Sequence, residues 1–336
     1  MAAVQPALLR ALYGLVGLGF ALLAASFYGL GIAPLSHQLR AMQERTLADG
    51  LATATSQLAT LLEQHQDMGR LTASRTAMRQ AQIDFLEGAL PRSALVSFAQ
   101  PKLVDAMVAG EDLIGIARFA PDGAFLFAAG VAPPLGAVAA CTRASSDTQP
   151  TPLPVERTPD GRLQLVYCSP IVDAVHGHVG HDVLIFGDRD IAAFLRAHVA
   201  AASVTALIST DGALVAWPQD ADQPTLQNAL RRWLANGDAG SGFSVRTQPA
   251  VLPDLSLAVV VDEVRFFAGI DRQIEHLTIA LGVMATAIAS SMFIGLRWWV
   301  RAVREGEAKL AYLAAHDPLT GLANRRAASD VLRAMW

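Results

Sequence analysis

The stretch LIGIARFAPDGAFLFAAG, at residues 113–130, decides the fold class of this chain. Two apolar runs flank the dipeptide Asp122-Gly123, and this arrangement is the sequence form of a β-hairpin. The same form returns at residues 204–218, VTALISTDGALVAWP, with an Asp-Gly turn of its own. An internal repeat of this kind predicts two similar structural modules in tandem.

Each hairpin is followed by a further strand that leads into an amphipathic helix. The two segments are VLIFGDRDIAAFL at residues 183–195 and LAVVVDEVRFFAGI at residues 257–270. In both, a short β-rich run gives way to a helical spacing of apolar residues. We therefore predict an α+β fold in which each module combines a small sheet with helices.

Two long apolar stretches lie outside the modules. Hydrophobic residues make up 52% of the chain and charged residues only 17%, which is too apolar for an ordinary soluble protein. Residues 11–33 and residues 277–296 contain no charged side chain, and each stretch is long enough to cross a bilayer core of about 30 Å as a helix. We predict two transmembrane helices. A cleaved signal peptide is the alternative for the first.

The distribution of charge predicts the orientation in the membrane. Residues 297–336 contain seven basic and four acidic residues and residues 1–10 contain one arginine, which leaves 18 basic and 26 acidic residues, a net charge of −8, between the spans. By the positive-inside rule, the basic flank is cytoplasmic. We expect a bacterial inner-membrane protein with two passes, a cytoplasmic tail at residues 1–10, both termini in the cytoplasm and an acidic periplasmic domain. This charge balance argues against nucleic acid as a partner.

Both cysteines, Cys141 and Cys168, lie between the spans, on the side where disulfides persist. A bond between them would stabilise the fold by roughly 3 to 4 kcal/mol in the chain-entropy model. No Cys-x-x-Cys spacing of the metal-binding kind competes with this pairing. We predict a disulfide, and two free buried thiols are the alternative.

Residues 35–87 contain few helix breakers and predict one long helix just outside the membrane. Its apolar positions follow one another at alternating spacings of four and three, which places them on a single stripe. The stripe consists of Leu47, Leu51, Ala54, Leu58, Leu61, His65 and Met68. A helix of this kind packs on its own domain or pairs with a twin. We interpret His65 as a packed side chain without a functional role.

The segment YCSPIVDAVHGHVGHDVLIFGDRDIAAFL, at residues 167–195, runs through a strand, Pro-Ile-Val, a turn, glycine, a second strand and a helix. Together with the repeat and the long first helix, this layout resembles the double Cache domain, a PAS-like extracytoplasmic sensor of bacterial receptors. The resemblance implies a periplasmic sensor over residues 34–276, with a membrane-distal module at 88–200 and a membrane-proximal module at 201–276. It also implies that an unidentified small molecule binds in the distal module.

Tyr167 and Asp173 are candidates for the ligand pocket by their positions in this resemblance. Amino-acid-binding members of the family carry an Arg-x-Trp-Tyr string, and nothing between Gly130 and Leu165 matches it. The sequence therefore does not identify the ligand.

His176, His178 and His181 have the spacing H-x-H-x-x-H. Alternate strand residues face the same side, so this spacing could hold Zn²⁺. Gly177 and Gly180, however, place the three histidines at the exposed tip of a hairpin. We predict a solvated turn rather than a metal site, and these histidines are the metal candidates that the sequence offers.

Residues 297–315 lead from the second span to the end of the chain. Their apolar positions again follow one another at alternating spacings of four and three residues. These positions are Trp299, Val303, Gly306, Leu310 and Leu313. We predict a short parallel coiled coil that continues the second membrane helix. A single amphipathic helix on the membrane or on its own domain is the alternative.

Residues 316–336, HDPLTGLANRRAASDVLRAMW, begin with a turn and continue as a helix. Pro318 biases the preceding residue away from helix, and Gly321 supplies a flexible position. The string DPLTGLANRR resembles the entry motif D-x-L-T-G-L-x-N-R-R of GGDEF domains, the diguanylate cyclase family, at every fixed position. The matching residues are Asp317, Leu319, Thr320, Gly321, Leu322, Asn324, Arg325 and Arg326.

The second resemblance implies structural and coupling roles. Asp317 and Thr320 would order the turn, and Asn324, Arg325 and Arg326 would fasten the helix to a cyclase body. In this family a homodimer joins two GTP molecules, each with Mg²⁺, into cyclic di-GMP, and the catalytic residues follow the entry motif.

We expect no catalytic residue and no cofactor within residues 1–336, and we expect this stretch to be inactive on its own. The alternative is a non-catalytic membrane sensor, or a degenerate GGDEF domain that gates a downstream cyclic di-GMP phosphodiesterase.

Overall fold

The computed structural model describes residues 6–144, 149–158, 162–218, 223–250, 252, 254–318 and 320–335. The chain divides into two compact units. The central unit consists of residues 42–268, and the terminal unit combines residues 1–41 with residues 269–336. The central unit is α+β and the terminal unit is helical.

The helices are α1 Pro6–Phe27, the π-helical turn Tyr28–Ile32, α2 Ala33–Ala73, α3 Thr76–Leu86, α4 Arg92–Ala109, α5 Leu135–Ala144, α6 Arg189–Ala197, α7 Pro224–Asn236, α8 Glu263–Ala315 and α9 Arg325–Met335. The strands are β1 Leu113–Phe119, β2 Phe125–Gly130, β3 Thr151–Pro152, β4 Glu156–Arg157, β5 Leu163–Asp173, β6 Gly177–Phe186, β7 Val199–Ala200, β8 Ser203–Ser209, β9 Leu214–Ala216, β10 Phe243–Pro249 and β11 Leu255–Asp262.

The strands form two antiparallel sheets, one in each predicted module. The distal sheet has the order β2-β1-β6-β5-β3, and β4 also pairs with β5. The proximal sheet has the order β10-β11-β8-β7, and β9 also pairs with β8. The prediction of an α+β fold with two tandem sheets is confirmed.

Both predicted hairpins form at their Asp-Gly turns. Gly123 and Gly212 have φ angles of 85° and 86°, a left-handed conformation that glycine adopts without strain. The Asp122 carboxylate accepts a hydrogen bond of 2.9 Å from the Ala124 amide, and Asp211 accepts one of 3.3 Å from Ala213. The two turns are therefore built by the same local chemistry.

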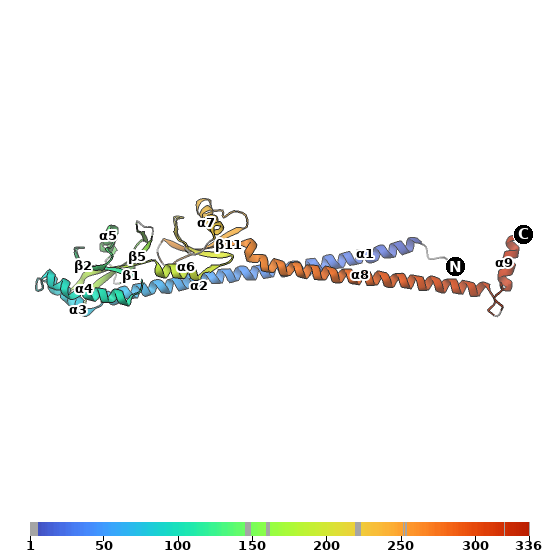
Figure 1. The fold of residues 1–336 in the computed structure, drawn as a ribbon, viewed down its shortest axis with the longest axis horizontal. Helices are drawn as coiled ribbons and strands as arrows, with labels where there is room; N and C mark the ends of the chain where they lie inside the picture. The colour runs from blue at the N-terminus through green and yellow to red at the C-terminus, as the bar shows by residue number, and fades with distance from the viewer. Residues whose placement is uncertain are drawn as a thin grey trace. The chain divides into compact units, whose positions relative to one another are not determined.

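Helix α2 lies along both sheets of the central unit (Figure 1). Leu58 and Leu62 of α2 are each 1% exposed. They belong to one continuous apolar core with Leu184 of the distal sheet and Leu257 of the proximal sheet. The structure shows this helix packed on its own domain, and its pairing with a second copy stays a prediction.

The single helix predicted over residues 35–87 is divided in the structure. Helix α2 ends at Ala73, and Arg75 has an extended backbone, with φ −60° and ψ 100°, before α3 begins. The break redirects the chain so that Met78 and Gln82 of α3 become fully buried. Tertiary packing of α3 thus overrides a helical pattern that continues through the break.

The opposite face of each sheet has a core of its own. In the distal module, α5 covers Val166 and Val183, together with Phe119. In the proximal module, α7 covers a second cluster that includes Leu230 and Val260. Each sheet is therefore covered on both faces, as the apolar runs of its central strands require.

The terminal unit holds the two predicted spans. Tyr13–Ala73 and Glu263–Ala315 are helical stretches that are long and apolar enough to cross a membrane. The rings of Tyr13 and Phe293 lie 4.9 Å apart, so α1 and α8 contact each other.

Helix α8 begins at the residue after β11 and continues without interruption to Ala315. It therefore carries the second predicted span and the predicted linker as one element. Trp299, Leu310 and Leu313 of the linker are exposed in the single chain. The coiled coil at residues 297–315 stays a prediction.

We predict that Leu58→Ala destabilises the protein by about 2–5 kcal/mol, because it removes a buried side chain of α2 from the core that includes residues of both sheets. The matched control is Leu71→Ala on the same helix, since Leu71 is 65% exposed. The control should change the free energy of unfolding by no more than about 0.5 kcal/mol. Urea unfolding of the detergent-solubilised chain measures the free energy of unfolding of both variants. Equal losses for Leu58→Ala and Leu71→Ala would contradict the packing of Leu58 in the core.

Candidate functional site

A buried ion pair joins the two central strands of the distal sheet. Arg118 of β1 stands opposite Asp182 of β6 in the strand register. The guanidinium donates from Nε to Oδ1 and from Nη2 to Oδ2, both at 2.7 Å, and both side chains are 0% exposed. A bidentate pair of this geometry neutralises both charges within the core.

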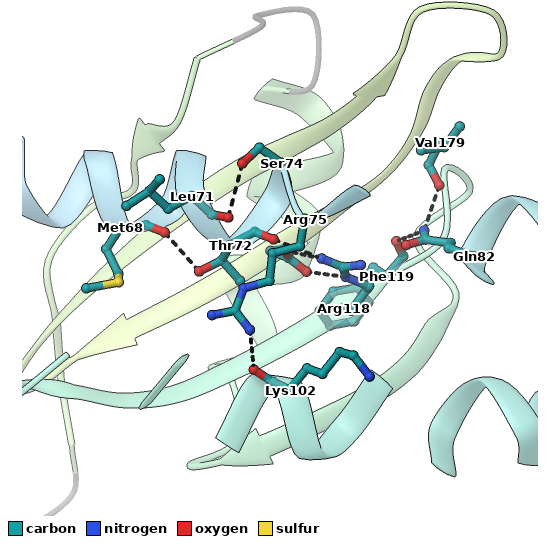
Figure 2. A network of polar contacts seen from close by, with 11 residues as sticks. Met68, Leu71, Thr72, Ser74, Arg75, Gln82, Lys102, Arg118, Phe119 and Val179 are labelled. Carbon is teal, nitrogen blue, oxygen red and sulfur yellow. Dashed lines mark hydrogen bonds and ion pairs between the residues drawn. The ribbon is translucent and has the colours of Figure 1, made fainter. Parts of the chain in front are cut away.

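The same arginine reaches the end of α2. Figure 2 shows Arg118 pointing toward Thr72, whose carbonyl oxygen lies 3.5 Å from Nη2. Nearby, Gln82 of α3 donates to the carbonyl of Val179 at 2.7 Å, and Arg75 donates to the carbonyl of Lys102 at 2.7 Å. This network fastens α2, α3 and α4 to the distal sheet at one end.

Tyr167, a predicted pocket residue, lies in the core under α2. Its side chain is 0% exposed, and its ring packs edge-on against those of His65 and Phe186. Within the described part of the chain its hydroxyl has no hydrogen-bond partner. Burial raises the pKa of this hydroxyl. The side chain is placed to pack the core rather than to meet solvent.

Asp173, the other predicted pocket residue, caps the turn between β5 and β6. Its Oδ1 accepts hydrogen bonds from the amides of Val175 and His176 at 2.9 and 3.1 Å. Its Oδ2 lies 3.3 Å from Nε of Arg79. The amide of Val175, followed by His176, holds the pKa of Asp173 at about 2. Asp173 thus orders the turn at the end of β5, whereas Tyr167 lies in the core of the same strand.

The three candidate histidines separate into a pair and a single residue. A β-bulge at Val179 shifts the register, with Ile171 paired to Gly180 and Val172 to His178. The shift brings the parallel rings of His178 and His181 to a centroid separation of 6.4 Å. His176 turns away, with Nδ1 3.0 Å from Asp173 and Nε2 3.3 Å from Glu87.

His181 is fully buried and stacks on Phe119 at a centroid distance of 5.4 Å. Neither of its ring nitrogens has a hydrogen-bond partner within the described residues. Burial, and then the neighbouring His178, lower the pKa of His181. The imidazole is therefore held neutral inside the distal module.

Cys141 and Cys168 form a disulfide with a Cα–Cα distance of 5.4 Å. The bond ties α5 to β5 on the face of the distal sheet opposite α2. Of the two alternatives for the cysteines, the structure shows the disulfide.

A cavity of about 460 Å³ lies where the distal and proximal modules meet, and its size falls in the range of small-molecule sites. Two arginines, Arg157 and Arg231, line it together with Asp188 and Trp217. Arg157 is oriented by its Nη2 group, which donates to the carbonyl oxygens of Leu214, at 2.8 Å, and Val215. The sequence offered no signal for this cavity, because its charged residues come from three separate segments.

The turn that begins residues 316–336 is ordered by Asp317. Its Oδ1 accepts hydrogen bonds from the Thr320 amide at 3.0 Å and from the Thr320 hydroxyl at 3.2 Å. Gly321 follows with φ 70°, and the carbonyl of Leu322 accepts a hydrogen bond from the Asp317 amide at 2.8 Å. Leu319 lies outside the described residues.

Asn324 joins the two helices of the motif. Its Nδ2 donates to the carbonyl of Ala314, in the last turn of α8, at 2.7 Å. Its Oδ1 accepts from the amide of Ala327, in the first turn of α9, at 3.0 Å. One side chain thus caps the end of one helix and the start of the next. The neighbouring Arg325 and Arg326 are exposed.

No family model and no curated protein matches this chain. Among solved structures, it is similar to a domain of a sensory box/GGDEF family protein from Vibrio parahaemolyticus, with 12% identity and a TM-score of 0.49 over 67% of this chain and 98% of that domain. It is also similar to the ligand-binding domain of the Pseudomonas fluorescens chemoreceptor CtaA in complex with L-isoleucine, with 15% identity and a TM-score of 0.47 over 69% of this chain and 97% of the other. A third similar structure is the V. cholerae histidine kinase DctB sensor domain, with 11% identity and a TM-score of 0.46 over 67% of this chain and 98% of that domain.

We predict that Asp182→Ala lowers the free energy of unfolding by about 3–5 kcal/mol, because it leaves the Arg118 guanidinium buried without a counter-charge. Asp67→Ala is the control, since its ion pair with Arg70 is exposed on α2. Thermal and urea unfolding of the whole chain measure both variants. A loss below about 1 kcal/mol for Asp182→Ala would contradict the assignment of this pair.

We predict that acidification destabilises the protein through His181. Because folding lowers the pKa of this imidazole, its neutral form contributes stability above about pH 6.5, and this stability is lost as the pH falls below that value. His181→Phe should therefore reduce the drop in Tm between pH 7.5 and 5.5 by about 2–4 °C.

His176→Gln provides a control of opposite sign. Its hydrogen bond with Asp173 raises the pKa of His176, so the charged form contributes stability below about pH 6.5. The His176→Gln variant should therefore lose more Tm than the wild type between pH 7.5 and 5.5. If Tm falls by the same amount between pH 7.5 and 5.5 in the wild type and in both variants, neither histidine affects the pH dependence of stability as described.

Proposed function

We propose that this chain is a two-pass membrane receptor of the diguanylate cyclase type. The observation that carries the proposal is the junction at Asn324, where the helix that leaves the last sensor strand is capped onto the helix of the output motif. Helix α8 is one element from β11 to Ala315, so a displacement at the proximal sheet reaches the motif without an intervening loop. An element of this kind suits a receptor that transmits a conformational signal.

The charge distribution supports the orientation. The central unit lies within the acidic stretch between the two apolar helices, and the motif follows the basic flank. This supports the proposal that the sheets lie in the periplasm and residues 316–326 in the cytoplasm, on either side of a bacterial inner membrane.

The cavity between the modules is the proposed place for a small molecule. Its two arginines suit a carboxylate, Asp188 suits an ammonium group, and Trp217 offers an apolar surface. A ligand there would touch both sheets, and it would shift the receptor only if it binds one arrangement of the modules more tightly than the other. Tyr167 and Asp173 stay predictions.

In a cyclase of the family that the motif resembles, the rate of synthesis depends on how the two domains of the dimer are aligned. Two cyclase domains of a homodimer, each with GTP and Mg²⁺, must align the reacting groups of their two substrates. Misplacement by about 1 Å can slow such a reaction about 100-fold. Rotation of paired α8 helices would therefore be enough to control synthesis of cyclic di-GMP.

The test joins residues 1–324 to an active cyclase domain at the shared motif and measures cyclic di-GMP formed from GTP and Mg²⁺. We expect the chimera to be active. One alanine inserted after Ala311 turns the motif by about 100° relative to the membrane helix and should change the rate about tenfold or more. A matched insertion of seven residues adds only about 20° of rotation and should leave the rate close to that of the parent chimera.

The unfused chain, residues 1–336, is the negative control and should form no cyclic di-GMP. An inactive chimera, or equal rates for the one-residue and seven-residue insertions, would overturn the proposal that α8 couples the sensor to a cyclase.

A further inference from the structure

Three side chains from distant segments meet where α2, β1 and α6 come together. His65 lies on α2, Asp112 precedes β1, and Asp190 lies in the first turn of α6. One potential ligand atom from each lies within 4.8 Å of the other two. His65 and Asp112 are each 6% exposed, and the Asp190 side chain is 33% exposed. The group is thus buried on one side and open on the other.

We propose that His65, Asp112 and Asp190 bind a divalent transition-metal ion, with Zn²⁺ as the best match. One imidazole nitrogen and two carboxylate oxygens form a ligand set that Zn²⁺ accepts, with a fourth position open to water. The same set disfavours Mg²⁺ and Ca²⁺, which take oxygen ligands.

The distance between His65 and Asp190 fits an ion better than a hydrogen bond. Nε2 of His65 lies 3.6 Å from Oδ2 of Asp190, which is too far for a hydrogen bond. Two ligands bound to a tetrahedral Zn²⁺ at about 2.0–2.2 Å lie about 3.3–3.5 Å apart. The pair therefore needs only a few tenths of an ångström of adjustment.

The imidazole of His65 is oriented and available. It stacks on Phe186 with a centroid distance of 4.0 Å and an interplanar angle of 13°, and Tyr167 packs against it edge-on. Its Nε2 faces Asp190 at 3.6 Å, and its Nδ1, on the other side of the ring, is buried without a hydrogen-bond partner among the residues that the structure describes. Burial lowers the pKa of His65, which keeps the imidazole in the neutral form that binds metals.

The two carboxylates are brought together by a hydrogen bond to the backbone. Oδ2 of Asp112 accepts a hydrogen bond of 3.3 Å from the Asp190 amide and so caps the start of α6. Burial is the main cause that raises the pKa of Asp112, and the charge of Asp190 raises it further. The adjacent Arg189 lies near Glu111 instead, with its Nη2 3.9 Å from that carboxylate. A bound dication would remove the repulsion between the two acids.

Gly187 makes room for this arrangement. A Cβ at this position would lie 2.7 Å from Oδ1 of Asp112, so a larger residue would push the carboxylate out of place. The pair His178 and His181, in contrast, belongs to no described group of three potential ligands. The group at His65 is therefore the stronger metal candidate of the two.

The test is a Co²⁺ and Zn²⁺ titration of the detergent-solubilised full chain. Co²⁺ absorption bands report its ligands, and Zn²⁺ competition gives the affinity. We expect one equivalent to bind. Asp112→Asn keeps the oxygen that caps α6, and Asp190→Asn changes a partly exposed residue, so both variants should fold. Each should weaken binding about 100-fold, since even losing an outer partner of a ligand costs about 10–100-fold.

His65→Gln should abolish the Co²⁺ bands in the visible range, and circular dichroism checks that each variant is folded. His176→Gln and His178→Gln are matched controls and should leave the affinity unchanged. The proposal is overturned if the wild type binds neither ion at about 1 mM, if binding survives in both aspartate variants, or if it is lost in His178→Gln.

Discussion

The central unit depends on the buried stripe of α2, which packs on both sheets at once. Leu58 and Leu62 share one core with strands of the distal and the proximal sheet. Interiors packed in this way transmit a displacement instead of absorbing it. The stripe of α2 therefore links the two sheets through one packed core, and the proximal sheet continues directly into α8. The Arg118–Asp182 pair fixes the far end of this path by tying both central strands to the last turn of α2.

Features that depend on neighbouring residues could be predicted from the sequence. The two hairpins follow from Asp-Gly turns, in which the aspartate accepts a hydrogen bond and the glycine takes a positive φ. The strand-to-helix segments and the apolar helices follow from periodicity. The cysteine pairing could be favoured but not decided, because the alternative of two free thiols depends on the distance that the fold sets between α5 and β5.

Features that depend on distant residues could not be predicted. Continuous helical periodicity concealed the break at Arg75, which exists because α3 buries Met78 and Gln82. Regular alternation would put His178 and His181 on opposite faces of the strand, whereas a bulge at Val179 brings their rings together. His65 looked like one more core position, since its acidic neighbours, Asp112 and Asp190, lie more than forty residues away in the sequence. An arginine in the apolar run of β1 was the one visible sign of the buried ion pair.

The disulfide between Cys141 and Cys168 has a consequence for biogenesis. It anchors α5, a helix of ten residues that covers one face of the distal sheet. The bacterial cytoplasm keeps thiols reduced, so in the proposed orientation the bond forms only after the chain has been translocated. A molecule inserted the wrong way round would keep α5 loosely attached and open to proteolysis. In the proposed orientation, the bond would therefore be present in correctly inserted copies and absent from inverted ones.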